Sequence, residues 1–399
     1  MAAVFLTAFL TAPFVLGCPT SVWAAQKASA WENEEETGPE EDDGLPGLLE
    51  IEEELAQLDQ FLGQTEAGDQ SLSFWELVKA AASGNVDQLL LLIGQSVEGL
   101  LLGEAKEGGS LLAQAALIGM LGAIFTHISS AFKGRQVSDA GFFAAYLLLF
   151  ACLAASFLAS LDMASQSLEQ ILEFMRLLMP VYFLAAAFAG GSASALAMYE
   201  TSIGAAALVQ WICGGILLTL VKIYVLLVLG GHAVREPFLT RLTELLEKAV
   251  DVSLKTLMGA VLGLHLIQAM VLPYADGAAQ AGARRVLEMI PGLGAGASAA
   301  AQVVLGSGVL IKNSIGAAGA IVLGLLVLAP AVKLGVLMAL YQCAAAVMEP
   351  VCDKRMVSCA AGVAKGHWLL LKIQLYSLLL FLLAIAITCG ASNVRYLAA

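Results

Sequence analysis

The chain has little charge for its size. Only 13% of its 399 residues are Asp, Glu, Lys or Arg, about half of the roughly 25% found in soluble domains. Apolar residues make up 59%, and the mean hydropathy is +0.83. This composition excludes a soluble globular domain and a disordered chain, so we expect an integral membrane protein.

Basic residues are scarce at the start of the chain. Residues 1–107 hold 3 basic and 20 acidic residues, whereas residues 108–399 hold 17 basic and 13 acidic ones. No basic stripe is long enough to neutralise phosphates, which argues against nucleic-acid binding. The split predicts two regions in different solvents, an acidic aqueous leader and a mildly basic apolar body.

The motifs of common catalytic and cofactor sites are also missing. The four histidines form no His-x-x-x-His pair, the seven cysteines form no Cys-x-x-Cys, and there is no Gly-x-x-x-x-Gly-Lys-Ser/Thr loop. We expect the histidines to make polar contacts or to lie at interfaces. The sequence therefore predicts no metal, no cofactor and no enzymatic activity.

Residues 1–25 predict a secretory signal peptide. An uncharged apolar run from Val4 to Leu16 is followed by small residues, as at a signal cleavage site. However, no base precedes the run, and Pro13 interrupts it. An uncleaved anchor and a lipoprotein acceptor at Cys18 therefore remain as alternatives.

Residues 26–70 form an acidic leader, which we expect to be disordered and extracytoplasmic. Residues 32–59 contain 13 acids and no base, so this stretch repels itself and cannot bury enough apolar surface to fold. Residues 71–110 then place apolar side chains at helical spacing, for example Phe74, Leu77 and Val78. This segment predicts amphipathic helices on the membrane or on a partner.

Residues 111–399 predict an all-α, polytopic membrane domain. A spanning helix needs about 20 mostly apolar residues, and about eight stretches qualify. These are 111–132, 141–161, 174–191, 203–230, 255–273, 290–311, 315–345 and 368–390. The distribution of Lys and Arg over the loops favours an extracytoplasmic leader and C-terminus. Pro330 is expected to kink or end its segment, which is too long for a simple span.

Matching residues at nearly constant spacing predict an internal repeat. Ser202-Ile203-Gly204-Ala205-Ala206 recurs 112 residues later, from Ser314 onward. The repeat units cover about 137–237 and 250–350. Three spans in each unit would invert one copy relative to the other, as in many transporters. The alternative is chance recurrence in helices rich in Gly and Ala.

Two sets of residues are candidate sites. Lys222 and Lys333 lie in apolar runs at matching repeat positions, where a charge is costly and so indicates function, although Lys222 could instead snorkel to the interface. The second set is rich in Gly and Pro and is typical of either a packing seam or a gate. It consists of Pro180, Gly190, Gly191, Pro291, Gly292, Gly294 and Gly296.

The segment from Ile290 to Gly294, together with Val304 to Gly316, resembles the stage III sporulation protein AE family of endospore-forming bacteria. The resemblance covers about residues 72–399. It implies a multi-pass subunit, in the mother-cell membrane around the forespore, of the channel-like complex that links the two cells. The implied partners are the other membrane proteins of the stage III sporulation A operon and, indirectly, the forespore protein stage II Q.

A second interpretation comes from another functional class. The repeat and the paired lysines are also compatible with an autonomous secondary transporter of a small solute. Neither interpretation assigns a catalytic residue.

Overall fold

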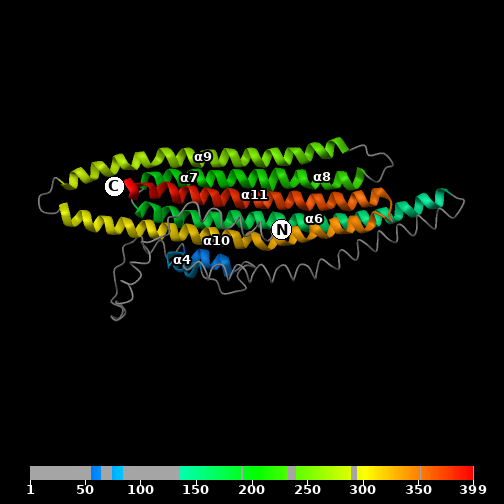
Figure 1. The fold of residues 1–399 in the computed structure, drawn as a ribbon, viewed down its shortest axis with the longest axis horizontal. Helices are drawn as coiled ribbons and strands as arrows, with labels where there is room; N and C mark the ends of the chain where they lie inside the picture. Colours follow the sequence, from blue (N-terminus) through cyan, green and yellow to red (C-terminus); the bar gives the residue numbers. More distant parts are fainter. Residues whose placement is uncertain are drawn as a thin grey trace.

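The computed structural model describes residues 55–63, 74–83, 135–189, 192–231, 240–288, 294–350 and 352–398. Every regular element in these ranges is a helix. The long helices lie side by side in one elongated bundle (Figure 1). The predicted all-α fold class is therefore confirmed for the part of the chain that the structure describes.

Five helical rods form the bundle. They are α6 (Arg135–Phe188), a continuous rod of α7 (Ser192–Gln210), η2 (Trp211–Leu217) and α8 (Leu218–Gly231), then α9 (Thr240–Glu288), α10 (Gly294–Met348) and α11 (Lys354–Ala398). Each rod runs antiparallel to the one before it (Figure 1). As a result, α6, α9 and α11 run in one direction, and the α7–α8 rod and α10 run in the other.

Each of the five rods contains a stretch long and apolar enough to cross a membrane, whereas the sequence predicted about eight spans. The predicted span 111–132 lies outside the described residues. Two pairs of predicted spans each fall in one helix: 141–161 and residues 174–188 of the next belong to α6, and residues 294–311 and 315–345 belong to α10. The count of eight is thus not confirmed.

The polar middle of α6 stays helical because nothing in it breaks a helix. Residues 162–176 contain neither Gly nor Pro, and their inner face keeps buried apolar side chains such as Leu168 and Leu172. The charged side chains share the outer face: Asp162, Glu169, Glu173 and Arg176 are all exposed. This stretch is therefore one polar stripe on a continuous helix and not a loop.

Prolines do not end the rods either. Pro180 lies inside α6 and Pro330 inside α10, so the prediction that Pro330 could end its segment is wrong. α6 and α10 contain 54 and 55 residues, which at 1.5 Å per residue is about 80 Å. Since a bilayer core is roughly 30 Å thick and helices tilt by at most about 40°, both rods must extend beyond it.

The two predicted repeat units contain two long rods each. Residues 137–237 cover α6 and the α7–α8 rod, and residues 250–350 cover most of α9 and all of α10. An even number of rods leaves both units in the same orientation, so the inverted three-span arrangement is wrong for the described rods. The repeat itself stays a prediction.

Residues 55–63 form a helix within the stretch predicted to be disordered. Leu55, Leu58 and Leu62 are buried on one face of this helix, because their spacing gives it an apolar stripe despite the surrounding acids. The ring of Phe61 packs 6.2 Å from that of Phe174 in α6. The prediction of disorder is therefore wrong for these nine residues.

A second short helix, α4 (Phe74–Ser83), lies in the predicted amphipathic segment and buries Phe74, Leu77 and Val78. The carboxylate of Asp59 accepts a hydrogen bond from the backbone N–H of Phe74, which satisfies one unpaired donor at the start of α4. The signal peptide, the leader up to residue 54 and the other residues of 71–110 lie outside the described residues.

Two glycines let α11 approach α8 closely. A Cβ atom at Gly362 would lie 2.2 Å from Val228 Cγ1, and one at Gly366 would lie 2.3 Å from Val225 Cγ2. Glycines four residues apart on one helix face are typical of tightly packed membrane helices. Here this spacing fixes the α8–α11 contact.

We predict that the double substitution Gly362→Ala and Gly366→Ala lowers the free energy of unfolding by about 1–3 kcal/mol, because the stiff β-branched valines cannot move away without shifting a helix. Thermal unfolding of the purified protein in detergent measures this. Gly335→Ala is the matched control, since an added Cβ there meets nothing within 4 Å. An unchanged unfolding temperature in the double variant would contradict the observed packing.

Cysteine labelling distinguishes five rods from eight spans. In a variant without native cysteines, single cysteines at Ala193 and Ala399 should react from the same side of the membrane, and those at Ala233 and Val351 from the other. Eight spans would place Ala193 and Ala399 on opposite sides. A membrane-impermeant maleimide, applied to intact and to permeabilised cells, gives the answer.

Candidate polar site inside the bundle

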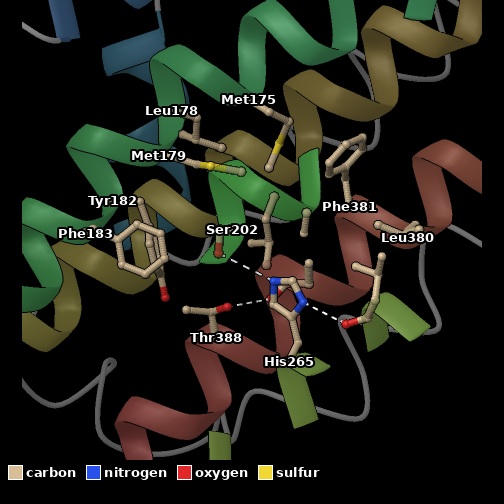
Figure 2. Close-up of a pocket in the computed structure, with 14 residues that line it drawn as sticks. Met175, Leu178, Met179, Tyr182, Phe183, Ser202, His265, Leu380, Phe381 and Thr388 are labelled. Carbon is tan, nitrogen blue, oxygen red and sulfur yellow. Dashed lines mark hydrogen bonds between the residues drawn. The ribbon is translucent and has the colours of Figure 1, made fainter. Parts of the chain in front are cut away.

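His265 of α9 links two rods through a small polar cluster (Figure 2). Its Nδ1 lies 2.9 Å from the carbonyl oxygen of Val261, and its Nε2 lies 3.5 Å from Ser202 Oγ on α7. In the neutral ring, an Nδ1–H that donates to Val261 leaves Nε2 to accept from the serine hydroxyl. One turn away, Gln268 Nε2 donates to Thr201 Oγ1 at 2.6 Å, so two polar contacts join α7 to α9.

A cavity of about 30 Å³ lies beside this cluster. Its other walls come from α6 and α11 and are mostly apolar, with the exception of Tyr182 and Thr388 (Figure 2). A water molecule takes up about 30 Å³ in the liquid. The cavity is therefore large enough to hold water.

A second buried histidine joins α6, α10 and α11. His367 is fully buried; its Nε2 lies 3.0 Å from Ser160 Oγ, and its Nδ1 lies 2.9 Å from the Val363 carbonyl oxygen. The ring of Tyr341 stacks on the imidazole at 5.3 Å, and the Tyr341 hydroxyl donates to Ser156 Oγ. Five side-chain and backbone groups from three helices thus form one polar layer.

Ion pairs join α9 to α11. Lys365 Nζ lies 2.6 Å from Glu247 Oε2, and Lys372 Nζ lies 2.8 Å from Asp251 Oδ1. From the first pair to the second, the residue number increases on both helices, as it must when two helices are parallel. Since these side chains are partly exposed, the pairs add little to stability, but they show the register between α9 and α11.

The start of α11 is fixed by Asp353. Its Oδ1 accepts a hydrogen bond from the backbone N–H of Arg355 at 2.9 Å and another from the guanidinium Nε at 3.2 Å. Partial burial raises the pKa of this carboxyl, but the two kinds of hydrogen bond from Arg355 and its positive charge together outweigh burial, and the pKa is lowered. Asp353 is therefore an ionised N-cap.

The structure separates the residues proposed from sequence as a site. Lys222 is exposed on α8, Lys333 is half-buried on α10, and Pro180 is half-buried within α6. Gly294 and Gly296 begin α10. The other members of that set, Gly190, Gly191, Pro291 and Gly292, lie outside the described residues. A role in packing, gating or pairing stays a prediction for all of them.

Sequence reasoning missed Lys312, which is 0% exposed within α10. The hydropathy pattern placed it in a short loop between two spans, yet it is among the largest fully buried side chains. A fully buried lysine is rare and is normally paired. The sequence feature that could have drawn attention to Lys312 is its position in the Val304–Gly316 segment, which carries the family resemblance.

Long apolar rods around a packed, polar-layered interior define the class as a polytopic helical membrane protein. A model of the family described as stage III sporulation protein AE (spore_III_AE) matches residues 72–392, and the chain belongs to this family, as the 290–316 segment predicted. Stage III sporulation protein AE of Bacillus subtilis (strain 168) is 24% identical over 290 residues, covering 72% of this chain and 73% of that protein. No solved structure matches.

We predict that Ser160→Ala lowers the free energy of unfolding by about 1–3 kcal/mol, since it leaves the Nε2 of a fully buried histidine without its partner. Gln166→Ala, on the exposed face of the same helix, is the control and should change stability little. Thermal unfolding in detergent compares the two. Equal effects would argue against a structural role for the histidine layer.

Proposed function

We propose that this chain is a membrane-embedded subunit of the channel-like complex that links the mother cell and the forespore during endospore formation. The observation that carries the proposal is family membership over residues 72–392. The proposed partners are the other membrane proteins of the stage III sporulation A operon and, through them, the forespore protein stage II Q. The proposal assigns the chain no catalytic role.

The packing of the bundle supports a subunit role. The described helices pack around one buried apolar core, and the cavity beside His265 is small, about 30 Å³. Large apolar side chains instead lie outside, for example on α9, where Leu245, Val252, Ile267 and Met270 are each more than 60% exposed. Such a surface needs lipid or other subunits as its cover.

The distribution of basic residues supports one orientation. Helices α6, α9 and α11 all start at one end of the bundle, which carries Arg135, Arg241, Lys354 and Arg355. The other end, where α9 and α11 finish, carries Arg284, Arg285 and Arg395. By the positive-inside rule the first end faces the cytoplasm, and the C-terminus then faces outside. One more crossing by residues 111–132 would place the acidic leader outside as well.

The transporter alternative loses its two sequence arguments. The units are not inverted in the described rods, and Lys222 and Lys333 differ in exposure and lie on helices separated by α11 in Figure 1. If the alternative nevertheless held, purified protein in liposomes would move a solute along an ion gradient by itself.

A tagged chain that restores sporulation to a deletion strain should co-migrate with other subunits of the operon on native detergent gels. An unrelated polytopic protein with the same tag is the control. Migration as a lone chain or a homodimer, in cells harvested during engulfment, would contradict the proposal.

Deletion of residues 32–54, which lie before the first described helix, should leave this assembly intact if the acidic leader only solvates the N-terminus.

A further inference from the structure

Two contacts measure the register between the parallel helices α6 and α11. Ser160 Oγ lies 3.0 Å from His367 Nε2, and Tyr182 OH donates to Cys389 Sγ at 3.4 Å. The partners are 207 positions apart in both pairs. Since the same offset holds at both ends of this stretch, the two helices keep one register between residues 160 and 182.

This register places Ser167 at the level of Gln374. Seven residues are close to two helical turns, so Ser167 shares a face with Ser160, and Gln374 shares a face with His367. The offset of 207 then brings Ser167 and Gln374 into one layer. Seven residues further along both helices, the next layer is apolar, with Phe174 and Phe381 both buried.

Both side chains in this layer are buried without a hydrogen-bond partner. Gln374 is 0% exposed and Ser167 is 3% exposed, and Gln374 Nε2, Gln374 Oε1 and Ser167 Oγ make no hydrogen bond to protein. A buried amide without partners is costly, and native proteins satisfy nearly all such groups. These three atoms therefore need a hydrogen-bond partner that the described side chains do not supply.

We propose that the Ser167–Gln374 layer is a binding site for one or two ordered water molecules. The layer offers one amide donor group, one amide acceptor and one hydroxyl, and water is a small ligand that can donate and accept at once. A cation fits less well, because the layer holds no carboxylate and the acids of α6 nearest in sequence, Asp162 and Glu169, are exposed on the outer face.

The hydrated layer holds α6 and α11 in register. A slip of α11 by one turn would move Gln374 away from Ser167 and its water and toward the apolar layer of Phe174 and Phe381. A single polar layer fixes register in this way in coiled coils. The α6–α11 interface then contains two polar layers, at His367 and at Gln374, and each is satisfied in only one register of the two helices.

A density map of the full-length protein at a resolution that shows ordered water tests the site directly. We expect a peak within hydrogen-bond distance of both Ser167 Oγ and the Gln374 amide. A direct hydrogen bond between the two side chains, with no peak, would overturn the proposal. So would a peak with cation-like oxygen distances and an unfolding temperature that rises with added sodium or potassium.

Variants test the same site independently of the map. Gln374→Leu together with Ser167→Ala removes all the groups that need water, so we expect an unfolding temperature within about 2 °C of the parent or higher. Gln374→Leu alone should unfold at a lower temperature than this double variant, because it leaves Ser167 unpartnered. If the double variant unfolds at the lower temperature of the two, the site is not a water-filled layer. Gln170→Leu, a half-buried position on α6, controls for the added apolar side chain.

Discussion

The bundle depends on α11 packing against every other rod. Figure 1 shows it between the α7–α8 rod and α6, and each neighbour contacts it by a different device. These are the Ser160–His367 hydrogen bond from α6, the glycine contact at Gly366 from α8, the Lys372–Asp251 ion pair from α9 and the close approach of Gly316 to Cys389 from α10. A helix that contacts every other rod buries most of its surface, so that surface must be largely apolar and the polar groups buried in it need partners inside the bundle.

Composition and hydropathy were sufficient to predict an all-helical membrane protein, and a short segment was sufficient to predict the family. They failed at residues 162–176 and at Lys312 because a hydropathy window averages over all faces of a helix. The charged side chains of the first stretch lie on the exposed face of α6, and the helix continues through them. Lys312 lies inside α10 and is buried, so it is not part of a loop. Which face a residue occupies is decided by neighbouring helices, and these cannot be read from a local window.

The candidate site illustrates the same limit. The histidines were expected to make polar contacts, and His265 and His367 do so, but their partners could not be named from sequence. Ser160 lies 207 residues from His367, and finding such a pair requires the register between two helices. The lysines behave likewise: apolar flanks singled out Lys222, which is exposed, whereas Lys365 and Lys372 form the ion pairs that join α11 to α9.

The length of the rods connects the fold to an assembly. Rods of about 80 Å cannot fit within a roughly 30 Å hydrocarbon core, so part of each lies in water or against other protein. Helices α6 and α9 run in the same direction (Figure 1). Phe143, Leu147 and Leu148 are exposed near the start of α6, whereas Ile267 and Met270 are exposed past the middle of α9. One bilayer cannot cover both groups if they are farther apart than its core is thick. An apolar surface left outside the lipid needs a protein partner, which is what a subunit of a larger envelope complex would have.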